Sequence, residues 1–586
     1  MLGGDDVARK NRWQGAWRRG DARALVIALV VTALVALAAL ALAPLDRQAA
    51  ETERHAIGPA PAADASQQGT ASSDGGRDGQ DGAGPQDGAS LQDEASQQDD
   101  ESDQQGLEDV DPSVTPSGQA LDARLDAYLD ASFPETHLPG AAVAVVDASG
   151  AVYERTLGDV SSADAPMLVG SLSKSFTAVC VMQLVERGLV ELDAPASSYL
   201  SNPGNLPPSV TVRSLLNQTS GLGYYDSEAQ ALARTEPGES AGSFSYANAN
   251  YDLLGRIVEG VSGEPYALYL RDHVLAPLGM GRSSADPGAT LVDGTSLAQA
   301  LAPGHRNWFG AFVADGFRHP EGPDAWGSAP SGYVASSLGD LERYLEMYLG
   351  RGAVPGTAGV QRVLDATSVD QMFLSRVPDP AGDTYYGMGW TSFSWDNDEL
   401  VLSHDGSVEG YCARMVLLPD RDMGIVVLTD ANDEIAGSSL FFEMADGVVQ
   451  TVAGDTPDPV DGSWYVDAHA GDDVVYAAAV AACALAVLWV GRWRRYLVRI
   501  GVGERGWRGL SLAGRLGTCA RLLPWPVLVG FVLTRPDAWG VPWRDLLTFV
   551  PDVSLVLVVC AALLAAAFVR RVAMLALVAR RHSRPA

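Results

Sequence analysis

The chain has 586 residues, more than one ordinary domain, and it carries a net charge of −32. So acidic a chain has no electrostatic attraction for nucleic acid, and it contains no basic helix-turn-helix or finger pattern, so we expect no nucleic-acid partner. The eight histidines show no HxH or HxxxH grouping and the five cysteines form no CxxC pair, so the sequence indicates neither a metal site nor a cofactor.

An uncharged apolar run of twenty residues, 24–43, follows a basic tail at 1–23. At a rise of about 1.5 Å per residue, a helix of this length crosses a bilayer core of roughly 30 Å. The alternative is a cleaved signal peptide, because Ala41-Leu42-Ala43 resembles a cleavage site. Pro44 should hinder cleavage there and the run is long for a signal core, so we favour an uncleaved membrane anchor.

Residues 44–118 form an acidic linker rich in Asp, Gln, Gly, Ser, Ala and Pro. Between positions 61 and 120 there are fourteen acidic residues and one basic residue, Arg77. A segment with so few large apolar side chains cannot bury enough surface to offset its conformational entropy. We therefore expect a disordered spacer between the membrane and a folded domain.

The next region, 119–455, alternates apolar and polar residues in the manner of a globular domain large enough for a full core. Its first apolar residues, from Leu121 to Leu129, lie at helical spacing. The sequence then predicts a pair of strands around a turn at Ser149-Gly150, a helix at 174–190 and a hairpin at 411–430.

After a linker at 456–473, three more apolar segments lie at 474–490, 516–533 and 553–569, before a basic tail at 570–586. We interpret them as transmembrane helices, which gives four spans with the N-terminal run. The arginine-rich flanks all fall on one side of these spans, so the positive-inside rule predicts cytoplasmic termini and an extracytoplasmic domain. A transport role is the alternative, but the spans lack the acidic or paired polar residues that carriers commonly show, Arg521 being the one exception.

The motif GSLSK at 170–174 opens the predicted helix after a strand that ends near residue 169. Residues three apart lie on one face of a helix, so the Ser171 hydroxyl and the Lys174 amine can meet. A lysine that burial keeps neutral can accept the serine proton. Of the 41 basic residues only Lys10 and Lys174 are lysines. Because an arginine cannot lose its proton near neutral pH, this choice indicates a chemical role for Lys174.

The surrounding segment, VGSLSKSFTAVCVMQLVERGLVELDAP, resembles the nucleophile segment of the superfamily of serine β-lactamases, penicillin-binding proteins and class C-like esterases. Later segments resemble further family motifs in the same order: TVRSLLNQTSGL at 211–222, FSYANANYDLLGRIVEGVSG at 244–263, APLGM at 276–280, SGYVASSLGDLERYLEMYL at 331–349, YGMGW at 386–390 and HDGS at 404–407. The resemblance covers roughly 119–455. It implies an α/β (α+β) fold of the β-lactamase/transpeptidase type, with an antiparallel sheet flanked by helices and an all-α subdomain, to which this chain adds transmembrane helices.

The resemblance also implies a role for each matching residue. Ser171 would attack a carbonyl and form an acyl-enzyme. Lys174 and Tyr246 would share the proton transfers through a hydrogen-bonded contact. Asn248 would position the substrate amide or the lysine.

On the opposite wall, His404 would orient a substrate carboxylate or assist proton transfer. Gly406 completes the His-x-Gly motif, and the backbone N–H groups of Ser171 and Ser407 would form the oxyanion hole. Each such donor is typically worth about 3–4 kcal/mol.

Two residues depart from the family pattern. His404 stands where β-lactamases have a lysine that binds the drug carboxylate, so we expect an esterase or a D-alanyl-D-alanine carboxypeptidase-like peptidase acting on a small ester, amide or peptide at the cell envelope. Gln218 stands where a histidine is more usual, which puts one supporting contact in doubt. A β-lactamase, or a non-catalytic sensor or scaffold of the penicillin-binding type, is the alternative.

Two other features have competing interpretations. Gly238-Glu239-Ser240-Ala241-Gly242 fits the GxSxG elbow of α/β-hydrolases, but that elbow needs an apolar strand before the serine and a helix after it. The preceding Ala-Arg-Thr-Glu-Pro is typical of a turn, so we favour Ser171. Whether Cys180 and Cys412 form a disulfide is left open by the sequence.

Overall fold

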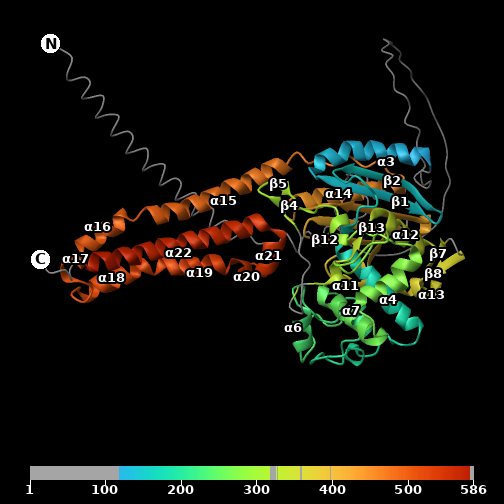
Figure 1. The fold of residues 1–586 in the computed structure, drawn as a ribbon, viewed down its shortest axis with the longest axis horizontal. Helices are drawn as coiled ribbons and strands as arrows, with labels where there is room; N and C mark the ends of the chain where they lie inside the picture. Colours follow the sequence, from blue (N-terminus) through green and yellow to red (C-terminus); the bar gives the residue numbers. More distant parts are fainter. Residues whose placement is uncertain (1–117, 317–324, 326, 357–358, 396–397, 581–586) are drawn as a thin grey trace, which may run out of the picture.

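The computed structural model describes residues 118–316, 325, 327–356, 359–395 and 398–580. The predicted tail at 1–23, the span at 24–43, nearly all of the linker at 44–118 and the last six residues lie outside the described residues. The described chain forms a mixed α and β domain from which a rod of helices extends (Figure 1).

The centre of the domain is an eight-stranded sheet in the order β2-β1-β14-β13-β12-β11-β10-β9, in which all neighbouring strands are antiparallel. The strands are β1 (Gly140–Asp147), β2 (Gly150–Gly158), β9 (Val377–Pro378), β10 (Tyr385–Gly387), β11 (Trp390–Ser394), β12 (Leu400–Val408), β13 (Tyr411–Leu418) and β14 (Met423–Thr429). The two hairpins predicted around Ser149-Gly150 and within 411–430 are therefore confirmed.

Both faces of this sheet are covered, which explains why β1 is apolar at almost every position. Ala141, Val143 and Val145 join a core beneath α3 (Gln119–Ser132) and α14 (Gly437–Ala453). The alternate residues Ala142 and Val146 join a larger core on the other face, where α12 (Leu338–Leu349) packs. Side chains of successive strand residues point to opposite faces, so one apolar strand serves two cores.

A helical subdomain lies below the sheet in Figure 1. It comprises α4 (Ser173–Glu186), α5 (Val212–Leu216), α6 (Glu228–Ala233), α7 (Asn248–Ser262), α8 (Tyr266–Leu270) and α9 (Ala276–Leu278). Helix α4 is buried from Ser173 to Leu184, so it is the central helix of this part of the fold. The predicted antiparallel sheet flanked by helices, with an all-α subdomain, is confirmed.

Smaller elements close the domain. Strand β3 (Met167–Leu168) pairs with β6 (Ala335–Ser336), and β15 (Ala431–Asn432) pairs with β4 (His305–Trp308), which pairs with β5 (Ala311–Val313). The remaining elements include α10 (Leu297–Ala300), α11 (Ala329–Gly332), α13 (Ala366–Leu374) and the hairpin of β7 (Ala353–Gly356) and β8 (Gly359–Arg362).

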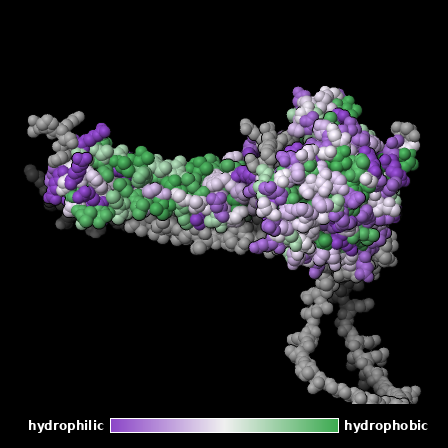
Figure 2. All heavy atoms as spheres, turned by 90° about the horizontal axis from the view of Figure 1, so that it is seen from below, coloured by the Kyte–Doolittle hydropathy of each residue, from purple (hydrophilic) through white to green (hydrophobic). Residues whose placement is uncertain are grey.

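The rod consists of α15 (Tyr465–Leu488), α16 (Gly491–Arg499), α17 (Val502–Arg505), α18 (Leu512–Leu522), α19 (Pro524–Leu533), α20 (Arg535–Ala538), α21 (Trp543–Phe549) and α22 (Pro551–Arg580). Three of its stretches, Tyr465–Arg499, Leu512–Leu533 and Pro551–Arg580, are long and apolar enough to cross a membrane. They contain the three apolar segments that the sequence predicts. Figure 2 shows an apolar surface along the rod between two polar ends.

The predicted linker at 456–473 is wrong in its second half, because α15 begins at Tyr465. The reason is tertiary: the Tyr465 ring stacks on His137, with 4.7 Å between ring centroids, and its hydroxyl accepts a hydrogen bond of 2.8 Å from Asn307 Nδ2. These contacts anchor the first turn of the helix to the domain.

The rod is attached to the domain by polar contacts at the small β15-β4-β5 sheet and at the segment between α5 and α6. His469 Nε2 of α15 lies 2.9 Å from Asp433 Oδ2. Arg306 of β4 donates to the carbonyl oxygen of Thr548 over 2.9 Å, and Arg544 donates to the carbonyl oxygen of Tyr225 over 3.0 Å. Helices and domain are therefore joined through several segments that lie far apart in sequence.

The cysteines of the domain form no disulfide. Cys180 and Cys412 are both free and buried. Cys180 belongs to the core around α4, whereas Cys412 belongs to the core beneath α14 on the other face of the sheet. The sheet between them prevents a bridge.

The side chain of Arg414 on β13 is fully buried and ties the sheet to α14. Its Nε donates to Asp405 Oδ1 over 2.6 Å, and its second terminal nitrogen donates to Asp405 Oδ2 over 2.8 Å. Another terminal nitrogen pairs with Asp446 of α14. Because Asp405 and Arg414 face each other across β12 and β13, this pair also fixes the register of the strand that bears His404.

We predict that Arg414→Met lowers the free energy of unfolding of the domain by about 3 kcal/mol, because it leaves Asp405 and Asp446 without their cation. Denaturant unfolding of the purified chain measures this. The control is Arg271→Met, which removes an exposed pair with Asp272 and should leave unfolding nearly unchanged. Equal losses in the two variants would contradict the prediction.

Candidate active site

Ser171 lies between strand β3 and helix α4, in a short 3₁₀ turn at Gly170–Leu172 that continues into α4. The preceding Gly170 has φ +56°, a conformation that glycine adopts without steric cost. A Cβ atom on Gly170 would lie 2.5 Å from the backbone nitrogen of Ser407, and one on Gly406 would lie 2.1 Å from the carbonyl oxygen of Val169. The two glycines therefore let the Ser171 turn pack directly on strand β12.

Lys174 is one helical turn beyond Ser171 and is fully buried. Its Nζ lies 2.9 Å from Ser171 Oγ, as the spacing predicts, 2.7 Å from Asn248 Oδ1 and 2.6 Å from the carbonyl oxygen of Ser331. Asn248 begins α7 and Ser331 lies in α11. Three separate helices thus meet at one amine.

Burial lowers the pKa of Lys174 to about 7, while the charge of Asp252 acts to raise it. A neutral amine has two N–H donors and one lone pair. Asn248 Oδ1 and the Ser331 carbonyl oxygen accept hydrogen bonds but cannot donate them, so they take both N–H groups. The lone pair is then directed at the Ser171 hydroxyl, which is the arrangement of a base and a nucleophile.

Tyr246 lies beside this pair, but it meets Lys174 through its ring and not through the hydrogen bond that the resemblance implied. The Nζ atom lies over the Tyr246 ring, 4.7 Å from its centroid, because its hydrogen bonds go to Ser171, Asn248 and Ser331. Burial raises the pKa of Tyr246 well above its usual value, Tyr386 adds to this, and a hydrogen bond with Ser171 opposes it. Tyr246 therefore keeps its proton at neutral pH, and its hydroxyl remains a hydrogen-bond donor in the site.

His404 lies on the opposite wall, with 6.4 Å between its ring centroid and that of Tyr246. Its Nδ1 lies 2.7 Å from the carbonyl oxygen of Asp405, which can only accept, so Nδ1 carries the proton. Its Nε2 is then the acceptor and lies 3.3 Å from the Tyr386 hydroxyl. Burial, followed by the charge of Lys174, lowers the pKa of His404 to about 4, so the ring is neutral at pH 7.

The Ser407 side chain points away from the Ser171 turn. Its hydroxyl donates to Glu434 Oε1 over 2.7 Å and accepts from Asn432 Nδ2 over 2.8 Å. These contacts hold the end of β12 while its backbone lies against Gly170. The backbone nitrogen of Ser407 is thereby held against Gly170, the residue before Ser171, where the resemblance implies an oxyanion hole.

The alternative nucleophile Ser240 is not in a catalytic setting. Residues 239–243 form turns and a bend between α6 and α7, without a strand before the serine or a helix directly after it. The GxSxG match at 238–242 is therefore a coincidence of sequence. No group of three His, Cys, Asp or Glu side chains suited to a metal ion occurs in the described part of the chain.

Comparison with known proteins agrees with this geometry. The Beta-lactamase family model matches residues 119–439. The chain belongs to the beta-lactamase family. The helical rod lies beyond the matched residues.

Among curated relatives, penicillin-binding protein 4 of Amycolatopsis lactamdurans is 30% identical over 362 residues, which cover 56% of this chain and 88% of that protein. Protein flp of Staphylococcus aureus strain MW2 is 24% identical over 342 residues, covering 53% of this chain and 63% of that protein. Among solved structures, the octameric penicillin-binding protein homologue from Pyrococcus abyssi is 25% identical with a TM-score of 0.47, covering 58% of this chain and 78% of that one.

Within the beta-lactamase domain, Gln218 supports the segment that carries Tyr246. It has φ +58°, its carbonyl oxygen accepts from the Ser245 nitrogen over 2.8 Å, and its Oε1 accepts from the Ala247 nitrogen over 3.0 Å. The residues on both sides of Tyr246 are thus held by one glutamine. The sequence marks this position only as a departure from the family pattern.

Sequence reasoning also missed three contributors to the site. The Ser331 carbonyl oxygen, Tyr386 and Asp252 lie inside segments that match the family, but no residue pattern singles them out. A backbone carbonyl oxygen has no signature in the sequence, and a buried tyrosine is usually part of a core. Only their approach to Lys174 and His404 in three dimensions reveals them.

We predict that Gly170→Ala slows modification of Ser171 by a fluorophosphonate about 100-fold, because the added Cβ must displace the Ser407 backbone from the oxyanion hole. The matched control is Gly188→Ala at the other end of α4. Gly188 also has a positive φ, +69°, but a Cβ there meets nothing within 4 Å. Similar rates in the two variants would show that backbone strain, and not the contact with β12, matters.

The rate of Ser171 modification should rise with pH and level off above a midpoint near the Lys174 pKa of about 7, because only the neutral amine accepts the serine proton. Lys174→Arg should abolish this rate, since arginine stays protonated. Asp252→Asn should move the midpoint to lower pH, because the Asp252 carboxylate favours the charged lysine. A profile that Asp252→Asn leaves unmoved would indicate a different titrating group.

Proposed function

We propose that this chain is a membrane-embedded serine hydrolase that forms an acyl-enzyme on Ser171 from an ester, a D-amino-acid amide or a D-amino-acid peptide. The observation that carries the proposal is the Lys174 amine, buried and 2.9 Å from Ser171 Oγ, with both N–H groups occupied by pure acceptors.

In the acylation step, Ser171 Oγ attacks the substrate carbonyl carbon while Lys174 takes the hydroxyl proton. The carbonyl oxygen becomes an oxyanion between the backbone nitrogens of Ser171 and Ser407. When the tetrahedral intermediate collapses, the bond to the leaving alcohol or amine breaks, and Tyr246 supplies its proton. In deacylation, water attacks the acyl carbon and gives its proton to Tyr246. The bond to Ser171 Oγ then breaks, and Lys174 returns its proton to that oxygen.

The proposed substrate class is based on the charge of His404. A neutral imidazole cannot attract a carboxylate as a permanently charged lysine would. The nearby Arg414 is held by Asp405 and Asp446 on the other face of the sheet. We therefore favour a substrate without a carboxylate at this position, an ester or amide, over a β-lactam drug.

A second candidate is a penicillin-binding protein or β-lactamase, and the relative from Amycolatopsis lactamdurans favours it. That relative is named for penicillin binding and is 30% identical over 88% of its length. A non-catalytic sensor is less well supported, because Ser171, Lys174 and Tyr246 are all present and lie together.

Labelling of the purified full chain with a fluorophosphonate and with a fluorescent penicillin tests these alternatives. We expect the fluorophosphonate to label the chain, Ser171→Ala to abolish the label, and the control Ser240→Ala to retain it. Label from the fluorophosphonate alone favours an esterase or amidase, whereas label from both probes favours the penicillin-binding type. No Ser171-dependent label from either probe would overturn the catalytic proposal.

We also propose that the domain faces the outside of the cytoplasmic membrane. Seven arginines lie between Arg492 and Arg515, at the end of the rod remote from the domain (Figure 1). The positive-inside rule places such an end in the cytoplasm.

A membrane-impermeant maleimide tests this orientation on intact cells. A cysteine at the exposed turn, Ser149→Cys, should be labelled, and Arg508→Cys should be labelled only after the membrane is opened. The reverse pattern would show that the domain lies inside the cell.

A further inference from the structure

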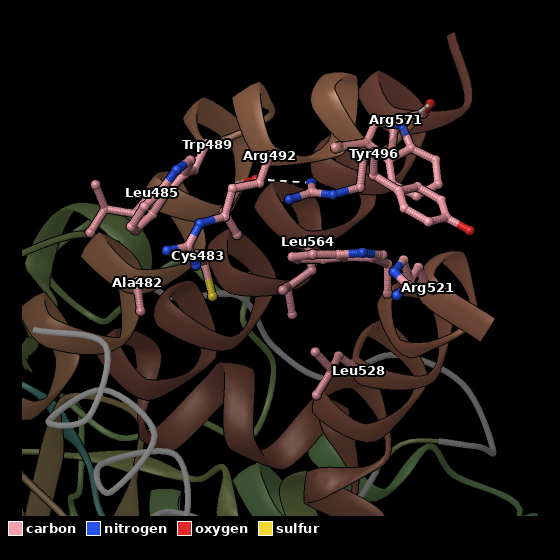
Figure 3. A pocket seen from close by; sticks show the side chains of 13 residues that line it. Ala482, Cys483, Leu485, Trp489, Arg492, Tyr496, Arg521, Leu528, Leu564 and Arg571 are labelled. Carbon is pink, nitrogen blue, oxygen red and sulfur yellow. Dashed lines mark hydrogen bonds between the residues drawn. The ribbon is translucent and has the colours of Figure 1, made fainter. Parts of the chain in front are cut away.

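A pocket of about 460 Å³ lies within the helical rod, far from Ser171. Its lining comes from the end of α15, from α16, from α18 and α19, and from α22, and Figure 3 shows these side chains converging from different helices. It is at the arginine-rich end of the rod, opposite the domain. The volume falls in the range of ligand-binding pockets, roughly 300–1,000 Å³.

Three arginines line this pocket, each with its guanidinium over an aromatic ring. The guanidinium carbon of Arg571 lies 3.8 Å from the ring centroid of Trp525, that of Arg521 lies 4.3 Å from Tyr496, and that of Arg492 lies 5.0 Å from Trp489. A ring beneath each guanidinium restricts its position, and the N–H groups of a guanidinium can bind planar or tetrahedral anions.

None of these three arginines forms an ion pair with a carboxylate within the described ranges of the chain. Arg571, which is only 7% exposed, donates instead to the carbonyl oxygens of Ala486 and Ala567, each over 2.9 Å. Arg521 donates to the carbonyl oxygen of Gly517 over 2.9 Å. Three positive charges that meet in one pocket without a counter-charge repel one another, so the pocket favours an anion.

The rest of the lining is apolar and points towards the middle of the rod. Leu485, Leu528 and Leu564 line the pocket beside the arginines, and Leu528 is exposed on the rod surface. If the rod spans a membrane, Arg and Trp side chains at this end lie at the level of the lipid headgroups, and the leucines lie at the level of the acyl chains. A small soluble anion would bind the arginines without contacting the leucines.

We propose that this pocket binds the phosphate headgroup of an anionic phospholipid from the cytoplasmic leaflet, with an acyl chain along its leucines. The proposal rests on the rod spanning the membrane and is independent of the chemistry at Ser171. Such a lipid would join α15–α16, α18–α19 and α22 by neutralising arginines from all three.

The experiment uses the purified full chain in neutral detergent, titrated with phosphatidylglycerol or phosphatidylcholine, with the thermal unfolding midpoint as the readout. We expect phosphatidylglycerol to raise the midpoint at concentrations about tenfold or more below those that phosphatidylcholine needs. The variant R492Q/R521Q, which changes two exposed arginines of the pocket, should lose this preference. It is chosen over a change at Arg571 because removal of that buried side chain can unfold the rod.

The matched control is R494Q/R499Q, which removes the same charge from exposed positions of α16 outside the pocket. It should keep the preference for phosphatidylglycerol within about twofold, since distant charges attract lipid only diffusely. Equal losses in the two double variants would overturn the proposal in favour of general electrostatic attraction. Equal stabilisation by the two lipids would overturn it outright.

Inorganic phosphate is the third ligand in the test. If it replaces phosphatidylglycerol and raises the midpoint equally well, the pocket is a site for a soluble anion and the lipid assignment is wrong. Fluorophosphonate labelling of Ser171 in the same samples separates this outcome from any failure of the hydrolase proposal.

Discussion

The arrangement of the domain depends on the hydrogen bonds of one buried amine, that of Lys174. An ammonium ion in this position would be costly because water cannot reach it, and the charge of Asp252 only partly offsets that cost. The site avoids this cost in two ways: burial lowers the pKa of the amine to about 7, and each of its hydrogen-bonding positions has a partner. That requires Ser171 from the turn before α4, Asn248 from the start of α7 and a carbonyl oxygen from α11. The three helices must therefore keep their mutual positions for the Lys174 amine to accept a proton.

The same constraint joins the helical subdomain to the sheet. The Ser171 turn lies on β12 with so little space that Gly170 and Gly406 have no room for side chains. Strand β12 presents His404 to the site on one face and Asp405 to Arg414 on the other. The buried ion pair behind the sheet thus supports the strand that forms one wall of the site. Strand β12 therefore contributes both to the stability of the domain and to the candidate active site.

The helical rod contacts the domain close to the candidate active site. Tyr225 accepts a hydrogen bond from Arg544, and the neighbouring Tyr224 ring lies 6.2 Å from that of Tyr246, centroid to centroid. On the other side, Ser407 contacts Asn432 and Glu434, and the adjacent Asp433 contacts His469 of α15. The segments on both sides of the site therefore also contact the rod.

Local sequence determined much of this protein. The spacing of Ser171 and Lys174 fixed their meeting, because a helical turn brings residues three apart together whatever surrounds them. Scarcity of lysine singled out the base, alternation and turn residues located the hairpins of β1–β2 and β13–β14, and continuous apolar runs located the three long helices of the rod. Tertiary structure decided the rest. The protonation states of Lys174 and His404 depend on burial among residues hundreds of positions apart, the role of the Ser331 carbonyl oxygen is invisible in any side chain, and α15 begins early because Tyr465 packs on the domain. Arg492, Arg521 and Arg571 line one pocket only because helices that are separated in sequence pack side by side. The sequence alone does not show that packing.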